Sequence, residues 1–433
     1  MICDNISVNE KGHLCFAGHD TGELAKKYGT PLYLMDEDKI REKCRKYVDS
    51  MKKYLPEGSH PLYASKAASF KRMYEIVRSE GMGTDVVSSG EIFTALKAGF
   101  PLEDAFFHSN NKTDADIEYA IKNGIGYFVV DCTEELMAIN KIAADNGIRQ
   151  GVLLRLTPGI DPHTYAAVNT GKVDSKFGTA IETGQAKDIT ALALSLENID
   201  LAGFHCHIGS QVFDSDALCQ GAEIMLGFIA EMKALYGYMP RLLDLGGGYG
   251  VRYTVNDPEG LDIEKEIKTL SECLYAKCKE LGITCPKILL EPGRSIVGDA
   301  GMTLYTVGSV KRITGYKNYV SVDGGMTDNP RFALYGSSYT IYNALKMNEE
   351  NSLDADVVGR CCESGDIIQM DVSLPECERG DIVAVLTTGA YNYSMSSNYN
   401  RLTRPPIVML KNDGTDYIAV KRETFENLTE NDI

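Results

Sequence analysis

The sequence lacks the features that would place the protein in a membrane, outside the cell or on nucleic acid. No apolar run approaches the roughly 20 residues needed to span a bilayer. Residues 1–10 carry Asp4 and Glu10 and lack the basic and apolar regions of a signal peptide. Basic side chains are outnumbered, with 44 lysines and arginines against 61 acidic residues and a net charge of −17. We therefore expect a cytoplasmic protein that binds neither nucleic acid nor membranes.

Paired-cysteine motifs, repeats, low-complexity tracts and basic runs are also missing. The 12 cysteines are spread along the chain without a CxxC pair, and Cys273 and Cys278 have no histidine nearby. Because no secretory signal accompanies these thiols, we expect most of them to be reduced and buried. The sequence predicts neither a disulfide framework nor a zinc or other metal site.

What is present is a strand–helix alternation in a chain long enough for two domains. The 433 residues are 44% hydrophobic and 24% charged, the balance of a soluble globular protein. Eight short apolar runs alternate with helix-like stretches over about 250 residues, which is the pattern of a (β/α)8 barrel. The runs are 61–65, 83–87, 105–108, 127–131, 151–156, 201–207, 242–245 and 287–290, and the expected helices are 36–54, 69–80, 89–98, 113–122, 133–146, 179–197, 216–236 and 263–281.

After Arg294 the helical periods fade and strand-like runs follow one another. They are 302–313, 319–322, 367–372, 381–386, 406–410 and 417–422, and the first 35 residues contain two more, in "HLCFAG" and "PLYLMD". The sequence thus predicts an α/β fold, with a (β/α)8 TIM-like barrel over residues 36–300. A second, mostly β domain, a sandwich or Greek-key barrel, is expected from residues 1–35 together with 301–433.

Polar or glycine residues end most of the eight barrel runs. A barrel gathers these ends on one face, where active sites form. Polar residues end strands in many proteins, but so many reactive or phosphate-binding groups at eight ends indicate an active site. The most unusual is Lys66, which stands among small residues in "YASKAASF". The others are Asp85, Asn110, Asn111, Asp131, Arg155, His207, Gly246, Gly247, Gly248, Glu291 and Arg294.

Two motifs indicate a phosphate and an aromatic ring. In "LDLGGGYG", three glycines leave backbone N–H groups open to a phosphate, and Val251 rules out the dinucleotide fingerprint. In "GFHCHIGSQ", His205 and His207 are expected to share one strand face, with Ser210 in the following turn. These histidines could bind a metal, but no third ligand has suitable spacing, and His205 could equally be a buried core residue.

Two further motifs supply a carboxylate, a cation and a thiol. "LLEPGRSIV" places Glu291 and Arg294 at the last strand end, as a partner for a ring nitrogen and an anion clamp, or as a plain ion pair. "CCESGD" places Cys362 and Glu363 in a turn. Together with Lys66 as the covalent attachment point, these parts specify a pyridoxal 5'-phosphate site.

The chain resembles the diaminopimelate decarboxylase family, in the alanine-racemase-like fold group of pyridoxal phosphate enzymes. The resemblance extends from residue 63 to residue 400, with modest departures at Ala68 and in the stretch 326–330. Its motifs are "YASKA", "GTDVVSSGE", "HSNNK", "GFHCHIGSQ", "LDLGGGYG", "EPGRSIV", "RFALYG", "CESGD" and "TGAYNYSMSSNYN".

The resemblance implies a role for each site residue. Catalysis is expected from Lys66, which would carry the cofactor, and from Cys362 as proton donor. The implied cofactor-binding residues are Lys66, Asp85, His207, Ser210, Gly246, Gly247, Gly248, Glu291, Gly293, Arg294 and Tyr391. The implied substrate-binding residues are Arg294, Arg331, Tyr335, Glu363 and Tyr391.

The expected reaction is decarboxylation of meso-diaminopimelate to L-lysine, in a homodimer with shared active sites. Two arginines suit a substrate with a second carboxylate, and a basic amino acid would leave them unpaired. The alternative is a decarboxylase of ornithine, arginine or carboxynorspermidine on the same scaffold. An amino-acid racemase or a non-catalytic, cofactor-binding regulatory protein fits Lys66 and Cys362 less well.

Overall fold

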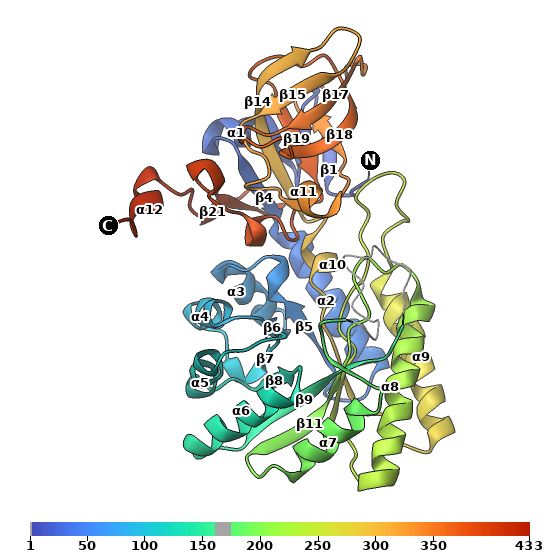
Figure 1. The fold of residues 1–433 in the computed structure, drawn as a ribbon. Coiled ribbons are helices and arrows are strands. Elements are labelled where there is room, and N and C mark those ends of the chain that lie inside the picture. The colour runs from blue at the N-terminus through green and yellow to red at the C-terminus, as the bar shows by residue number, and fades with distance from the viewer. Residues whose placement is uncertain (1, 161–174) are drawn as a thin grey trace. The chain divides into compact units, whose positions relative to one another are not determined.

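The computed structural model describes residues 2–160 and 175–433, and the chain divides into two compact units. One unit comprises residues 43–250 and 260–295 and contains the barrel. The other comprises residues 1–42, 251–259 and 296–433 and is mostly β. Figure 1 shows both units, and each is described here by itself.

The first unit is a closed barrel of eight parallel strands. Each strand pairs in parallel with the next, and β13 pairs with β5 to close the ring. Most strand residues are buried, because helices cover the outside and side chains fill the inside of such a barrel. The strands are β5 (His60–Ala64), β6 (Gly83–Val86), β7 (Ala105–Phe107), β8 (Tyr127–Val130), β9 (Gln150–Thr157), β11 (Ile199–His205), β12 (Leu242–Asp244) and β13 (Lys287–Leu290).

Helices follow the strands and flank them in Figure 1. Local sequence sets several of their ends: the Ser88 side chain caps the start of one helix, Thr113 forms a capping box at another, and Gly237 and Gly282 end two more with positive φ. These helices are α3 (Lys71–Ser79), α4 (Ser89–Lys97), α5 (Asp114–Lys122), α6 (Thr133–Asp145), α7 (Gln185–Ser195), α8 (Ser215–Tyr236) and α9 (Ile263–Leu281). Two further helices, α2 (Glu37–Tyr54) before β5 and α10 (Arg294–Val297) after β13, include residues of both units.

The interior of the barrel is filled by apolar side chains from successive strands. They form one cluster of Leu62, Phe106, Val129, Leu153, Ala202, Leu242 and Leu289, with Tyr127 packed against it. Because this layer fills the barrel interior, the polar residues that follow the strands lie next to an apolar, packed core.

The second unit is built from two sheets and two apolar cores. A three-stranded sheet has the order β1-β2-β3, and the larger sheet runs β18-β17-β15-β14-β4-β20-β21, with β19 joining β14 to β16. The structure thus confirms the predicted fold class, a (β/α)8 barrel with a second, mostly β part. The elements are β1 (Ile6–Val8), β2 (Leu14–Phe16), β3 (His19–Asp20), α1 (Thr21–Tyr28), β4 (Leu32–Asp36), β14 (Gly301–Arg312), β15 (Asn318–Val322), α11 (Arg331–Tyr335), β16 (Ile341–Asn343), β17 (Leu353–Val358), β18 (Ile367–Leu374), β19 (Ile382–Leu386), β20 (Ile407–Leu410), β21 (Asp416–Val420) and α12 (Phe425–Thr429).

Two local expectations are wrong. The stretch 179–197 begins as a short strand, β10 (Thr179–Ala180), and its helix starts only after Gly184, which has a φ of 84°. Strand β11 ends at His205, so His207 lies beyond the strand instead of sharing its face. Within the described residues, no helix is both long enough and apolar enough to cross a membrane.

Candidate active site

Lys66 stands directly after β5, in a short 3-10 turn over Ser65–Ala67. Its Nζ lies 3.9 Å from Oδ2 of Asp85, whose carboxylate is fully buried. Asp85 also accepts a hydrogen bond of 3.0 Å from the backbone N–H of Ser65, which fixes the start of the turn. Burial raises the pKa of Asp85, and the Lys66 charge opposes that rise. The lysine is thereby held at the strand end, with its side chain 43% exposed.

The small residues around Lys66 allow close packing of the backbone. A Cβ on Gly293 would come within 2.8 Å of the Ala64 Cβ and 3.1 Å of the Ala67 Cβ. The Ala64 N–H in turn donates to the Pro292 carbonyl at 3.1 Å. The Pro292-Gly293 segment therefore lies directly against the Lys66 turn, which larger side chains at these positions would prevent.

The triple glycine also brings backbone close to backbone. Gly246 and Gly248 have φ values of 70° and 106°, which a side chain would strain. A Cβ on Gly247 would lie 2.0 Å from the carbonyl oxygen of Glu291, so only glycine fits there. The Gly247 N–H donates to Nδ1 of His207 at 3.3 Å, and burial lowers the pKa of His207 well below its usual range. A neutral imidazole is therefore oriented beside the glycines.

Arg294 and Ser210 meet at the same end of the barrel. The Arg294 Nε and Nη2 groups both donate to Ser210 Oγ, at 3.2 and 3.1 Å. Arg294 is buried, with an exposed fraction of 5%. A buried guanidinium beside a hydroxyl and the glycine backbone forms a favourable environment for a phosphate.

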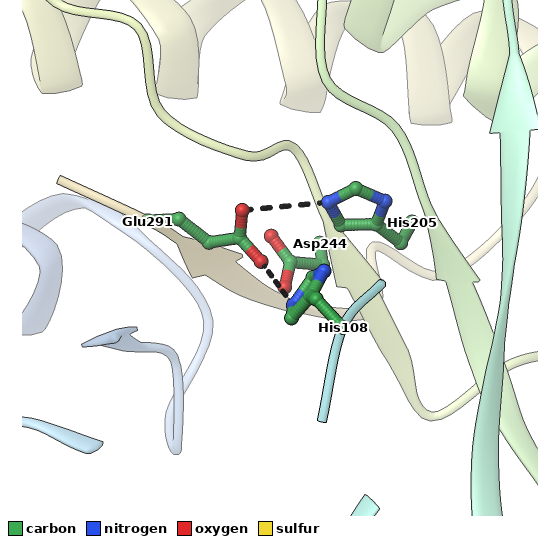
Figure 2. Close-up of side chains that lie close together, drawn as sticks. All are labelled: His108, His205, Asp244 and Glu291. Carbon is green, nitrogen blue, oxygen red and sulfur yellow. Dashed lines mark hydrogen bonds and ion pairs between the residues drawn. The ribbon is translucent and has the colours of Figure 1, made fainter. Parts of the chain in front are cut away.

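Four buried side chains lie close together after or at the ends of barrel strands, as Figure 2 shows. His205 Nε2 lies 3.4 Å from Glu291 Oε2, and His108 Nε2 lies 2.7 Å from Glu291 Oε1. The two imidazoles are 4.9 Å apart and nearly perpendicular. Asp244 completes the cluster and accepts a 2.9 Å hydrogen bond from the Gly246 N–H. Parallel register explains the grouping, because His205 pairs with Asp244 of the neighbouring strand.

The pKa values within the cluster diverge. Burial alone would raise the pKa of Glu291, but His108 and His205 outweigh burial and hold it well below its usual range. Burial and the charge of Glu291 raise the pKa of Asp244 well above its ordinary value. Burial lowers the pKa of His205 to about 4. Burial and neighbouring groups therefore favour the ionised form of Glu291, the protonated form of Asp244 and the neutral form of His205.

A metal ion is the other ligand that this cluster could hold. One ligand atom from each of the four residues lies within 4.8 Å of the others. Burial beside Glu291 raises the pKa of Asp244, so a cation bound to this carboxyl would have to displace its proton. The glycines, Ser210 and Arg294 nearby favour an organic phosphate instead.

In the second unit, Arg331 begins α11 and is buried, with an exposed fraction of 6%. Its Cζ lies 5.2 Å from the ring centre of Tyr335 and 5.5 Å from that of Tyr391. The Nη2 group donates to Ser337 Oγ at 3.4 Å, but the buried Nε has no hydrogen-bond partner among the described residues. Tyr391 has a φ of 63°, uncommon for a residue with a side chain and typical of functional positions.

Cys362 and Glu363 are exposed in a turn that Asp366 organises. The Asp366 carboxylate accepts hydrogen bonds of 2.6 Å from the N–H groups of Met326 and Cys361. The Cys362 N–H donates to Asn400 Oδ1 at 2.8 Å, which fixes the backbone beneath its thiol. The thiol is thus presented to solvent by an ordered turn.

The structure brings together seven of the predicted residues around the ends of the barrel strands. It also places two residues there that were not predicted from the sequence. Gathered in the barrel unit are Lys66, Asp85, His207, Gly247, Glu291, Ser210 and Arg294. His108 and Asp244 were not predicted as site residues, although each follows or ends a barrel strand. Their positions, first in "HSNNK" and directly before "LGGG", were the available signal.

Comparison with known proteins identifies the class. A family model described as "Pyridoxal-dependent decarboxylase, pyridoxal binding domain" matches residues 37–298, so the barrel is that of a pyridoxal-dependent decarboxylase. Diaminopimelate decarboxylase of Bacillus subtilis (strain 168) is 42% identical over 98% of this chain and 96% of its own length. That of Staphylococcus aureus (strain COL) is 42% identical over 99% of each chain.

The chain is also similar to solved structures of diaminopimelate decarboxylases. A diaminopimelate decarboxylase from M. jannaschii in complex with L-lysine has a TM-score of 0.91 and 32% identity, covering 100% of this chain and 98% of its own. The chain belongs to the diaminopimelate decarboxylase family.

The residues present fit pyridoxal phosphate, the cofactor of the family. Glu291 is buried, and its pKa is held well below its usual range, so it can provide the carboxylate that a partner for a ring nitrogen requires. Gly246–Gly248 and Ser210 provide donors for a phosphate, and Lys66 provides the amine for covalent attachment.

Proposed function

We propose that this chain is a pyridoxal phosphate-dependent diaminopimelate decarboxylase, which converts meso-2,6-diaminopimelate to L-lysine and CO₂, the last step of lysine biosynthesis. The observation that carries the choice of substrate is the buried Arg331 guanidinium, whose Nε has no partner among the described residues. A buried donor on a cation is costly to leave unpaired, so it favours a substrate with a second carboxylate.

The barrel residues would hold the cofactor. When bound, pyridoxal phosphate supplies an electron-poor ring that takes up the electron pair left by the departing CO₂. Lys66 would attach it covalently, and His207 would stack on its ring. Asp85 would contact Lys66 and the cofactor. Ser210, Gly246, Gly247, Gly248, Gly293 and Arg294 would bind its phosphate, and Glu291 would keep a proton on its ring nitrogen.

The second unit would supply the substrate contacts. Arg331 would bind the distal carboxylate, and Tyr335 and Tyr391, whose rings lie near its guanidinium, would keep that cation oriented. Arg294 and Glu363 complete the proposed substrate-binding set, and Tyr391 would also touch the cofactor. Cys362, with its exposed thiol, would return a proton to the carbon that loses CO₂.

The proposal includes a homodimer with shared sites, in which Lys66 of one subunit works with Cys362 of the other. The exposure of Cys362 and Glu363 supports this assignment, because a residue that serves a partner's site must be accessible on its own subunit. A cytoplasmic location is also proposed, and it is supported by the 12 free cysteines, which suit a reducing compartment.

The test is release of CO₂ from meso-diaminopimelate, measured against ornithine, arginine, lysine and carboxynorspermidine. We expect release from meso-diaminopimelate to exceed the others by at least about tenfold in kcat/KM, because the others lack one charge-assisted contact to Arg331. Faster release from a basic substrate would overturn the choice of substrate, and release from none of them would overturn the proposed activity.

A further inference from the structure

Three buried side chains around Glu291 have no role in the proposed function. His108, His205 and Asp244 have exposed fractions of 5%, 1% and 0%. Placing four ionisable side chains together away from water is unfavourable unless the cluster carries little net charge. Most of the four groups are therefore expected to be neutral, and the small remaining charge must lie on one of them.

Both histidines of the cluster face the carboxylate of Glu291. The two histidines approach different oxygens of its carboxylate, each through Nε2 (Figure 2). His205 Nδ1 is buried without a hydrogen-bond partner in the described part of the chain. The proton of a neutral His205 is therefore best placed on Nε2, where it faces Glu291.

A protonated Asp244 can also donate a hydrogen bond to Glu291. Its Oδ1 is occupied as an acceptor by the Gly246 N–H at 2.9 Å. Its Oδ2 is buried and has no hydrogen-bond partner among residues 2–160 and 175–433. A proton on Oδ2 would satisfy that atom and let Asp244 donate to the neighbouring Glu291 carboxylate, whereas two adjacent carboxylates would repel each other.

We propose that His108, His205 and Asp244 are positioning residues that keep the negative charge of this cluster on Glu291 and hold its carboxylate in place for the cofactor. The inference rests on the proposed function, because it assigns these residues to the ring nitrogen of pyridoxal phosphate. The directions of the pKa shifts agree with it, because the pKa of Glu291 is lowered, that of Asp244 is raised and that of His205 is lowered to about 4.

Other charged groups near the cluster affect the same balance. Arg155 on β9 and Lys66 after β5 contribute positive charge, and Asp85 on β6 contributes negative charge. His207, like His205, has its pKa lowered by burial. Removing a donor from Glu291 would raise the pKa of that carboxylate, so its charge, and with it cofactor binding, would be lost at higher pH than in the wild type.

Matched variants separate the donor role from packing. In Asp244→Asn, the amide can still accept from the Gly246 N–H and donate to Glu291, whereas Asp244→Leu keeps the volume and does neither. His205→Gln keeps a donor near Nε2, whereas His205→Met does not. Far-ultraviolet circular dichroism of all four purified proteins would establish that they are folded.

The first measurement concerns the proton on Asp244. An infrared difference spectrum between the cofactor-loaded wild type and Asp244→Asn should contain the C=O stretch of a protonated carboxylic acid at neutral pH, shifted in heavy water. Carboxylate bands in its place would overturn the proposal.

The second measurement is the dissociation constant of pyridoxal phosphate and the visible spectrum of the bound cofactor as a function of pH. Asp244→Leu and His205→Met should each weaken binding roughly 10- to 100-fold, and the loss should grow as the pH falls. Asp244→Asn and His205→Gln should stay close to the wild type. Equal, pH-independent losses in the donor and non-donor variants would mean that the residues only fill space, which overturns the proposal.

These readouts do not depend on the identity of the substrate. If the wild type binds the cofactor but releases no CO₂ from meso-diaminopimelate, the proposed function fails while the spectra still decide the positioning role. If CO₂ is released and the non-donor variants bind and titrate like the wild type, only the positioning role fails.

Discussion

Replacing Arg331 by methionine tests the choice of substrate most directly. Methionine retains an unbranched apolar stem but removes the guanidinium that lies near the rings of Tyr335 and Tyr391. The protein should remain folded, because the variant removes a buried cation whose Nε has no partner among the described residues. The variant should weaken the binding of a ligand that has a distal carboxylate.

The expected size of the effect follows from one lost charge-assisted hydrogen bond, worth roughly 1.5–3 kcal/mol. That corresponds to a loss of roughly 10- to 150-fold in affinity. The distal carboxylate is not altered in the reaction, so it binds ground state and transition state alike. The loss should therefore raise KM for meso-diaminopimelate and change kcat much less. Arg331→Lys should fall in between, since an ammonium keeps the charge without the planar fork.

The assay pairs steady-state CO₂ release with inhibition by two ligands. L-Lysine keeps one carboxylate, that of the distal end, so its inhibition constant should rise by the same factor as KM. Cadaverine has no carboxylate, and its inhibition constant should not change. Arg379→Gln is the matched control, because Arg379 is exposed in the same unit and, among the described residues, its side chain donates to the Gly308 carbonyl. A KM for meso-diaminopimelate that Arg331→Met leaves unchanged would refute the assignment of the distal carboxylate.

Further predictions address the cofactor, the dimer and pH. Lys66→Ala should abolish both turnover and the visible absorbance of bound cofactor, and full activity in that variant would exclude the covalent role. Glu291→Gln should bind the cofactor less tightly and, once saturated with it, release CO₂ far more slowly, because a neutral amide does not keep the ring nitrogen protonated; an unchanged rate would contradict this. Mixing Lys66→Ala with Cys362→Ala subunits should restore about a quarter of wild-type activity once subunits exchange, since half the dimers then have one intact site; no recovery despite exchange would exclude shared sites. Burial raises the pKa of Asp328 to about 7, so it binds a proton more tightly when folded, and stability should fall as pH rises from its ordinary pKa of 3.8 toward 7. Asp328→Asn should remove about 1.4 kcal/mol per pH unit from that slope in denaturant titrations, and an unaltered slope would show that Asp328 does not titrate there.

Most of the fold could be predicted because its signals are local. Parallel strands buried on both faces give apolar runs such as 151–156 in the sequence, and amphipathic periods give the helices between them. The stretch 179–197 was misassigned because Gly184, which separates a short strand from its helix, does not interrupt the apolar pattern. The end of β11 at His205 depends on pairing with β12, which the residues of β11 alone do not determine.

Part of the candidate site could likewise be predicted from local motifs, and part of it could not. Lys66, the triple glycine and Glu291 could be recognised in the sequence, because each belongs to a short motif whose chemistry is contained in its own residues. The cluster around Glu291 could not, since His108 and Asp244 belong to different strands and meet it only when the barrel closes. Closure also removes these side chains from water, and that burial decides which carboxyl keeps its proton. The sequence by itself thus determined the barrel and the kind of cofactor, whereas only the tertiary structure decided which atoms face each other and which of them are charged.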